Sequence, residues 1–476
     1  MRKIALFLAV SAMLASVIVL TSCSTHVHTL SEPMVENEIP ATCQTMGSYE
    51  EVTYCLECNL ELQRKPKKTD RVSHNFVDHV CSMCEKRDDE SSEGLVFVLN
   101  PDGQSYALET KGLGTCLDTE IVITTYNGLP VTKIRYGALE GCKNITKITL
   151  PDTIEVIEKY AFKDCTSLES INIPTGVKVI EYETFKGCSS LKSIEFPASV
   201  YEIGDYAFRA CSSLANVTFT ENLTTISTGA FMDCDSFTEV HIPRTVPEIG
   251  TDAFSGCDNL ETVEIADGVA IIGIRAFDDC PKIKELELPY SISKISDAAF
   301  RKCSALESVI MQNNVSMIGN QAFSDCYSLE QIILSTSLTD LRTSAFQGCS
   351  SLAEISLPSS LTSLGSNVFS FCTALTEVVI PDKVSIIGTE TFSGCTTLKK
   401  VTFGTGLISL GARTFQDCEA LESVIFKDTK DWYYLDEASS STGTPISESV
   451  FKDPATFAIT YMQNIYFDKY LKKISN

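Results

Sequence analysis

The chain contains 476 residues, of which 44% are hydrophobic, and its formal net charge at pH 7 is −24. So large an acidic excess repels nucleic acid and anionic membrane surfaces at long range, which disfavours a nucleic-acid-binding function. The length allows either two or three globular domains or one elongated array, and the twenty cysteines must be explained by their spacing and compartment.

Residues 1–22 predict a lipoprotein signal peptide. A short basic start precedes an uncharged apolar run over residues 4–20, which is too weakly flanked to be a lasting transmembrane span. The run ends in LTSC, which resembles the bacterial lipobox, after whose cleavage the cysteine becomes the acylated N-terminus. We therefore expect an exported chain that is lipid-anchored to the cell envelope through Cys23. An ordinary signal peptide with an incidental or disulfide-bonded cysteine is the alternative.

Residues 23–93 are predicted to form a small Cys/His-rich module and a linker. Two CxxC motifs lie there with four of the five histidines and one further cysteine: Cys55, Cys58, Cys81, Cys84, His26, His28, His74, His79 and Cys43. Two CxxC pairs can supply the four thiolates that structural Zn²⁺ prefers, and so small a module needs a metal ion or a disulfide to stabilise its fold. We favour one zinc ion held by the four CxxC cysteines. Two disulfides are the alternative, and CxxC redox catalysis is weaker still because no βαβ pattern surrounds the motifs.

Residues 94–134 are predicted to cap the N-terminal edge of a repeat array. Within 95–109, the segments VFVL and SYAL flank a Pro-Asp-Gly turn, which indicates a β-hairpin. Such a hairpin could cover an exposed sheet edge.

Thirteen cysteines recur at one period in residues 135–427, which is the signature of a repeat architecture. Each follows the previous one by 23 residues, without insertion or deletion: Cys142, Cys165, Cys188, Cys211, Cys234, Cys257, Cys280, Cys303, Cys326, Cys349, Cys372, Cys395 and Cys418.

The repeating unit is C-x2-L-x2-[IV]-x-[ILF]-P-x2-[LV]-x2-I-G-x2-[AT]-F-x2-C. Its I-x-I triplet alternates as a short strand does, with the middle side chain outward, and proline ends the strand. Triplets such as 171–173, 263–265 and 378–380 therefore predict one short parallel strand per repeat. The later apolar positions, including a Phe in every repeat, indicate a loose helical or 3₁₀ return segment. One unit cannot fold alone, so the repeats should stack into a right-handed, curved solenoid.

The start of the unit matches the leucine-rich repeat consensus, although other residues, such as Thr153 and Gly176, occupy the position of its usual asparagine. With its A-F-x2-C ending and 23-residue period, the chain closely resembles the BspA-like leucine-rich repeat surface proteins, the treponemal repeat type, over about residues 120–427. The resemblance implies an α/β repeat fold, a leucine-rich repeat solenoid over 135–427. Residues 124–134 resemble the family's opening turn.

The resemblance extends to the C-terminus, where 428–440 look like the family's closing segment. We expect residues 428–476 to form a C-terminal cap that folds over the last repeat.

The periodic cysteines recur beside Phe and Leu, like core residues. We therefore expect them to pack as small hydrophobic side chains, with disulfides between adjacent turns as the alternative.

We expect no enzymatic activity. The sequence contains no G-x-S-x-G, P-loop, H-E-x-x-H or G-x-G-x-x-G motif, and His241 is the only histidine of the array. A catalytic triad around His241 would need a positioned nucleophile, and the nearby Ser and Thr residues occupy ordinary variable positions.

The outward strand position, seven residues after each cysteine, lines the sheet face of the predicted solenoid. It is occupied by Glu195, Thr218, His241, Glu264, Glu287, Ile310, Ile333, Ser356, Val379, Thr402 and Ile425, and the position two residues earlier includes Glu239, Glu285, Glu354 and Glu377. An acidic stretch thus passes into an apolar one, and an exposed apolar patch rimmed by charge commonly marks an interface. The candidate partner-binding residues are Glu264, Glu287, Ile310, Ile333 and Val379. A solvated face with a few β-favouring side chains is the alternative.

The resemblance implies a function, because BspA-like proteins are surface proteins associated with attachment. We expect an adhesin-like, surface-exposed binding protein whose partners are host matrix proteins, host cells or other bacteria, and not nucleic acid. An envelope lipoprotein that organises other surface proteins, with no host ligand, is the alternative. A zinc- or thiol-dependent enzyme centred on the N-terminal module is a distant third hypothesis.

Overall fold

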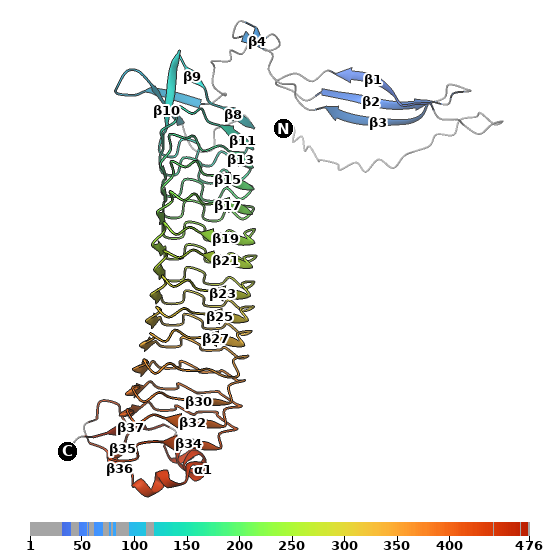
Figure 1. Ribbon diagram of the computed structural model, residues 1–476. Coiled ribbons are helices and arrows are strands. Elements are labelled where there is room, and N and C mark those ends of the chain that lie inside the picture. The colour runs from blue at the N-terminus through green and yellow to red at the C-terminus, as the bar shows by residue number, and fades with distance from the viewer. Residues whose placement is uncertain are drawn as a thin grey trace, which may run out of the picture. The chain divides into compact units, whose positions relative to one another are not determined.

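The computed structural model describes residues 31–39, 47–54, 56, 61–69, 76–77, 80–81, 95–110, 119–440, 442–466 and 468–474. The chain divides into two compact units, Met1–Glu90 and Ser91–Asn476. Figure 1 shows both units.

The described part of the first unit consists of β-strands. Three of them form an antiparallel sheet in the order β1-β2-β3, and two shorter ones form a hairpin. They are β1 (Met34–Ile39), β2 (Gly47–Tyr54), β3 (Glu61–Thr69), β4 (Phe76–Val77) and β5 (Val80–Cys81). Arg64 of β3 lies 3.0 Å from Glu36, 2.5 Å from Glu50 and 2.8 Å from Glu61, so ion pairs cross the sheet on its exposed side. This sheet was not predicted from the sequence.

The second unit is a stack of 23-residue turns, and one side of every turn but one carries a short strand at the predicted triplet. The strands are β8 (Glu120–Val122), β11 (Lys147–Thr149), β13 (Ser170–Ile171), β15 (Ser193–Glu195), β17 (Asn216–Thr218), β19 (Glu239–Ile242), β21 (Thr262–Ile265), β23 (Glu285–Glu287), β25 (Ser308–Ile310), β27 (Gln331–Ile333), β30 (Glu377–Val379), β32 (Lys400–Phe403) and β34 (Ser423–Phe426). Paired strands are parallel and offset by one repeat, as in Ile310↔Ile333. The predicted leucine-rich repeat solenoid with its parallel strands is confirmed. We call this side the strand face; it runs down the right of the column in Figure 1.

A second parallel ladder, which the sequence did not predict, lies on another side of each turn. Its strands are two residues long: β12 (Val156–Ile157), β14 (Val179–Ile180), β16 (Glu202–Ile203), β18 (Thr225–Ile226), β20 (Glu248–Ile249), β22 (Ile271–Ile272), β24 (Lys294–Ile295), β26 (Met317–Ile318), β28 (Asp340–Leu341), β29 (Ser363–Leu364), β31 (Ile386–Ile387) and β33 (Ser409–Leu410). From β14 to β33 they pair continuously within one sheet, whereas the strand face is broken into shorter sheets. We call this side the second ladder.

The third side contains the recurrent A-F segment of the unit. Where a loose helical or 3₁₀ return segment was expected, it has turns with i→i+3 hydrogen bonds and no continuous helix. In residues 159–164, alternate amides bond within the turn and to the next turn: Lys163 N–H donates to Tyr160 O, and Phe162 N–H donates to Thr184 O at 2.9 Å. Two residues per turn make this possible by adopting left-handed φ angles, as Tyr160 (62°) and Asp164 (57°) do. We call this side the turn face.

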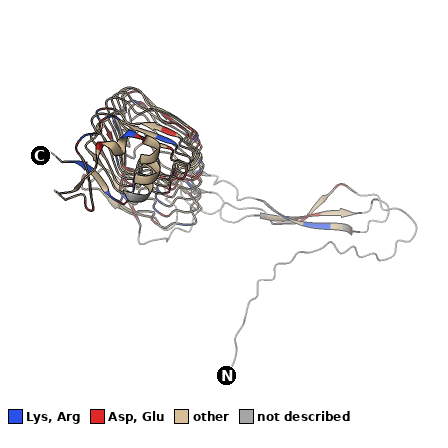
Figure 2. Cartoon of the chain, turned by 90° about the horizontal axis from the view of Figure 1, so that it is seen from below, with Lys and Arg blue, Asp and Glu red and all other residues tan. Residues whose placement is uncertain are grey.

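The core contains two columns that run the length of the solenoid. The phenylalanines from Phe162 to Phe415 stack from turn to turn, with ring centroids 5.1 Å apart for Phe162–Phe185 and 5.9 Å apart for Phe346–Phe369. Beside them, the thirteen periodic cysteines are buried and none of them forms a disulfide, as expected for packed side chains. Viewed from its end, the stack has its turns overlying one another (Figure 2).

Both ends of the stack are covered. At the N-terminal end, β6 (Leu95–Leu99) and β7 (Tyr106–Thr110) form the predicted hairpin, and β7 extends the sheet through β10 (Leu129–Ile134), which also pairs with β9 (Thr125–Tyr126). At the other end, the described elements are β35 (Trp432–Leu435), β36 (Thr444–Pro445), the 3₁₀-helix η1 (Glu448–Lys452), α1 (Pro454–Thr456), the π-helix η2 (Phe457–Ile465) and β37 (Tyr470–Lys473). The helical segment lies across the end of the stack in Figure 2, and β37 pairs antiparallel with β33.

Candidate functional site

The strand face presents two columns of outward side chains, five and seven residues after each cysteine. In β23, for example, Glu285 and Glu287 are exposed while Leu286 between them is buried. This alternation follows from the pleat of a strand, and it places every seventh-position residue above its counterpart in the neighbouring turn. The face is therefore a ladder whose chemistry is set by the outward residues alone.

The five candidate partner-binding residues all project from this face. Glu264 and Glu287 are exposed on β21 and β23, and Ile310, Ile333 and Val379 remain 39%, 59% and 54% exposed on β25, β27 and β30.

The structure brings three of the five into direct register. Glu287 pairs with Ile310, which pairs with Ile333 in the same sheet. Val379 lies two turns further along, past Ser356. Thr402 and Ile425, at the same position in the last turns, are half-buried.

Charge is distributed unevenly around the two isoleucines. Four exposed glutamates have no ion-pair partner among the residues that the structure describes: Glu285, Glu287, Glu307 and Glu330. Lys284 is next to Glu285 in sequence. A carboxylate without a partner keeps its charge available for an incoming cation. The Ile310–Ile333 pair is therefore an apolar spot inside an acidic rim.

The histidine of the array also lies on this face. His241 Nδ1 is 2.7 Å from Glu264 Oε2 and its Nε2 is 4.0 Å from Glu239. Among the described contacts, no hydroxyl or thiol is bonded to the imidazole, and the group forms a surface hydrogen-bonding pair with Glu264.

A shallow hollow of about 460 Å³ near the N-terminal turns was missed by sequence reasoning. It lies beside Asn172, whose side chain bonds to the neighbouring turn as a strand backbone would. The Asn172 Oδ1 accepts from the N–H of Leu150, and its Nδ2 donates to the C=O of Leu150, both at 2.8 Å. The ladder is interrupted there, because β13 ends at Ile171. An asparagine in the middle of the I-x-I triplet, where most turns have a residue that only faces solvent, was the available signal.

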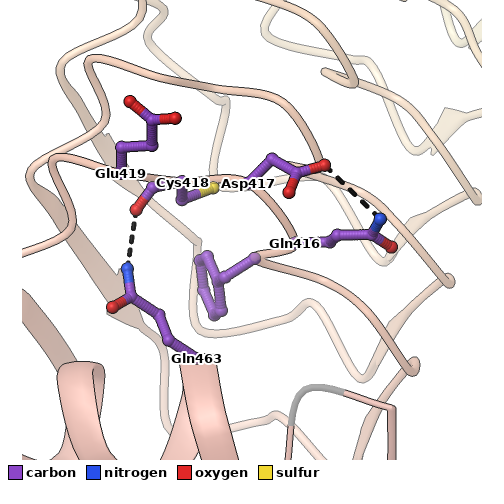
Figure 3. Close-up of a pocket in the computed structure, with 6 residues that line it drawn as sticks. Gln416, Asp417, Cys418, Glu419 and Gln463 are labelled. Carbon is purple, nitrogen blue, oxygen red and sulfur yellow. Dashed lines mark hydrogen bonds between the residues drawn. The ribbon is translucent and has the colours of Figure 1, made fainter.

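A second cavity, of about 420 Å³, opens beside the last repeat and the C-terminal cap (Figure 3). Gln463 Nε2 donates to the backbone oxygen of Cys418 at 2.7 Å, which ties the cap to this repeat. The Cys418 thiol itself donates to Phe392 O at 3.0 Å, and burial raises its pKa to about 12. A thiol held protonated and bonded in this way is a poor nucleophile, so the cavity lacks the chemistry of a reactive cysteine.

The remaining predicted sites fall outside the described residues. Cys23, Cys55, Cys58 and Cys84 are not described, and of Cys81 only the backbone at the end of β5 is. Within the described part of the chain, no three His, Cys, Asp or Glu side chains are grouped as a metal site would require.

A stack of 23-residue turns with a parallel strand per turn and a core of Leu, Ile and Phe is a leucine-rich repeat solenoid. A family model described as BspA type leucine rich repeat region, in six copies, matches residues 132–261, 224–353 and 316–434. These overlapping matches span more than half of the chain. The chain therefore belongs to the BspA-type leucine-rich repeat family.

One similar solved structure has the same architecture, and two others are similar in sequence. A leucine-rich repeat protein from Bacteroides ovatus is 29% identical, with a TM-score of 0.57 over 70% of this chain and 93% of that one. A leucine rich cell surface protein from Faecalibacterium prausnitzii is 24% identical (TM-score 0.43; 72% and 96% covered), and the pneumococcal vaccine antigen PcpA is 21% identical (TM-score 0.47; 71% and 87% covered). The sequence matches no curated protein.

Membership in this family carries a general function. Leucine-rich repeat proteins generally bind other proteins, the repeat family is typically non-enzymatic, and BspA-like relatives are cell-surface proteins. In the part of the chain that the structure describes, no helix has the length and apolar character to cross a bilayer.

Proposed function

We propose that this chain is an adhesin-like cell-surface protein that binds host matrix proteins, host cells or other bacteria through its strand face. The observation that carries the proposal is the aligned pair Ile310 and Ile333, exposed on two neighbouring strands of the strand face and bordered by glutamates that have no ion-pair partner among the described residues. Burying exposed apolar side chains against a partner removes them from water, which lowers the free energy of the complex.

The chemistry of the face also specifies the partner surface. A complementary protein presents an apolar side chain to the Ile310–Ile333 pair and lysines or arginines to Glu285 and Glu287. The charged rim would accelerate association and make it dependent on salt, while the apolar centre would set the lifetime of the complex.

The test is binding of the purified chain to a panel of matrix proteins and partner cells. Replacing Ile333 with Asp should weaken binding about tenfold or more, because a charge is placed in the centre of the contact. Glu287→Lys should weaken binding and flatten its dependence on salt. The matched control is Ile386→Asp, since Ile386 is 50% exposed on the second ladder and lies off the strand face. Binding that is equally indifferent to Ile333→Asp and Glu287→Lys would reject this face.

The anchor is a separate part of the proposal. We propose that Cys23 is lipidated and holds the protein to the envelope. Cys23→Ala should move the chain from the membrane fraction to the soluble fraction, and unchanged fractionation would contradict the assignment.

The alternative function is an envelope scaffold that organises other surface proteins. The two are separated by accessibility on intact cells, because an adhesin must be reached by added protease or antibody. A chain that is shielded on cells and binds none of the panel would favour the scaffold.

A further inference from the structure

Four consecutive turns at the N-terminal end each contribute one tyrosine to the turn face. Tyr136, Tyr160, Tyr182 and Tyr206 meet edge to face, with ring centroids separated by 5.0, 5.3 and 6.2 Å. Tyr136 is 64% exposed and the other three are half-buried. We call these four residues the tyrosine strip; it lies on a different side of the turns from the strand face.

The solenoid fold does not require these rings. In later turns the same two positions hold Thr251 and Asp252, then Ile274 and Arg275. Two of the tyrosines also occupy strained backbone, since φ is 62° at Tyr160 and 55° at Tyr206, and a bulky side chain is unfavourable there.

The next turn makes room for the strip. A Cβ atom on Gly229 would lie 2.4 Å from the Tyr206 ring, so the glycine allows that ring to lie flat against the backbone. Every turn has a left-handed residue at this position, so the backbone conformation belongs to the fold, and only the bulky aromatic side chain there is particular to the strip.

The charges beside the strip neutralise one another. Lys163 lies 4.9 Å from the centre of the Tyr160 ring and pairs with Glu140 at 3.5 Å and with Glu183 at 3.4 Å. Lys186 also pairs with Glu183, at 3.0 Å. At the other end, Arg209 pairs with Asp233 at 3.4 Å.

Because these cations already have carboxylate partners, the charges nearest to the strip are paired and its aromatic surface lies between them. A surface of this kind complements an uncharged ligand and offers little to a nucleic acid or another polyanion.

The tyrosines alternate between two adjacent columns, and this sets a spacing. Tyr136 and Tyr182 occupy one position of the unit and Tyr160 and Tyr206 the next, so each column repeats every second turn. Two turns of a parallel stack advance about 9.6 Å. A polyproline II helix rises about 3.1 Å per residue and repeats every three residues, or about 9.3 Å. The two repeats agree closely enough for a bound segment to meet successive tyrosines in the same way.

We propose that the tyrosine strip binds proline-rich peptide segments in the polyproline II conformation, laid along the solenoid axis. Prolines three residues apart pack on tyrosines of one column, and the bare carbonyls of the ligand accept hydrogen bonds from exposed hydroxyls such as that of Tyr136. Such a ligand is already extended before it binds, so little conformational entropy is lost, as in other aromatic-lined polyproline sites. This site is independent of the strand face.

The experiment is calorimetric titration of the full chain with a proline decamer, with a glycine–serine decamer as the reference peptide. Tyr136→Ala and Tyr160→Gly should each weaken binding of the proline decamer about tenfold. Both variants should fold, because Tyr136 is mostly exposed and the left-handed backbone at position 160 suits glycine. Tyr290→Ala is the matched control, since Tyr290 is 65% exposed and lies outside the strip. Ile333→Asp should leave this titration unchanged, which separates it from the proposed function.

Three results would overturn the proposal. The first is absence of heat with the proline decamer, and the second is equal binding of the two decamers. The third is binding of cellohexaose, but not of the proline decamer, that is lost in Tyr136→Ala; it would reassign the strip to a neutral glycan.

Discussion

At the scale of single residues, the periodic cysteines are core residues with one hydrogen-bonding role. Each thiol from Cys188 to Cys418 donates to the backbone oxygen of the Phe 26 residues earlier, as Cys280 does to Phe254 at 3.1 Å. That oxygen lies in the core, where an unpaired carbonyl would be unfavourable. An alanine would fill less space and remove one hydrogen bond to this oxygen, which in most turns also accepts a backbone N–H, as Phe162 O does from Cys165 at 3.2 Å.

The buried thiols should make the protein sensitive to alkali. Burial raises the pKa of Cys280 to about 12, above its ordinary value of 9.0. A folded-state pKa that is raised contributes stability below pH 9, and this contribution is lost as pH rises towards 12, at about 1.4 kcal/mol per pH unit for one thiol. We expect Cys280→Ala to be less stable than the natural chain at pH 7 by about 1–3 kcal/mol, and this gap to narrow between pH 9 and 11. Urea unfolding with reductant at each pH measures the gap; a constant gap would contradict the prediction.

The left-handed residues give a second prediction at this scale. Ala210 and Gly187 occupy the same position, immediately before a cysteine, with φ angles of 59° and 75°. Ala210→Gly should stabilise the chain by about 0.5–1 kcal/mol, because relief of left-handed strain exceeds the entropy that glycine adds to the unfolded state. Gly187→Ala should do the reverse, since its Cβ would lie 2.3 Å from Asp164 Oδ1. Urea midpoints that move in the same direction for both variants would be inconsistent with this account.

At the scale of elements, the sequence predicted the strands that carry side-chain alternation and missed those that do not. The triplet Val263–Ile265 has an apolar–polar–apolar pattern, so β21 was expected where it lies. The second ladder has two residues per turn, such as Ile271–Ile272, and two residues are too few to establish a period.

The turn face could have been anticipated in part. Nine of the twelve residues that precede the cysteines from Cys165 to Cys418 are Gly or Asp, the types that best tolerate left-handed backbone. The outward residues of the strand face were predictable from the period of the strand. The unpaired charges around Ile310 and the meeting of four tyrosines were not, because they depend on which turns lie side by side.

The C-terminal cap can be tested through the single tryptophan of the chain. Trp432 is 1% exposed in β35, and its ring is 5.2 Å from that of Phe426, the last aromatic residue of the array. Phe426→Ala should weaken docking of the cap by about 3–5 kcal/mol, so tryptophan emission should shift at a lower urea concentration than far-UV circular dichroism. Ile425→Ala, on the outward side of the same strand, is the control and should leave the two transitions as they are. Coincident transitions in Phe426→Ala would indicate that cap and array unfold together.

At the scale of the whole molecule, the solenoid should tolerate loss of a complete turn but not of a fraction. Deleting residues 350–372 joins Cys349 to Thr373 with every column still aligned. The unfolding enthalpy should fall by about 16 kcal/mol near 60 °C, in proportion to the residues removed. Deleting 350–371, one residue fewer, shifts every later side chain against its column and should abolish cooperative melting of the C-terminal turns. Scanning calorimetry compares the two; similar melting of both would argue against a one-dimensional stack.

The N-terminal module carries the remaining prediction. We propose that the purified chain contains about one Zn²⁺, which is lost when Cys55, Cys58, Cys81 or Cys84 is replaced by Ser. Elemental analysis measures the metal. A metal-free chain in which mass spectrometry finds those four thiols paired would replace zinc by two disulfides.

Because the periodic thiols are buried only after folding, the rate of folding competes with the rate of thiol oxidation. In the folded protein each periodic thiol is buried, and burial raises the pKa of thiols such as Cys280, which makes them poor targets for oxidants. In the unfolded chain the same thirteen groups are exposed, and a single mispaired bridge would hold apart turns that must stack. Because contacts between neighbouring turns are local in sequence, the stack can close quickly. The order of events then decides the outcome: a chain that folds before it meets an oxidant keeps its thiols reduced indefinitely, and one that meets the oxidant first is trapped.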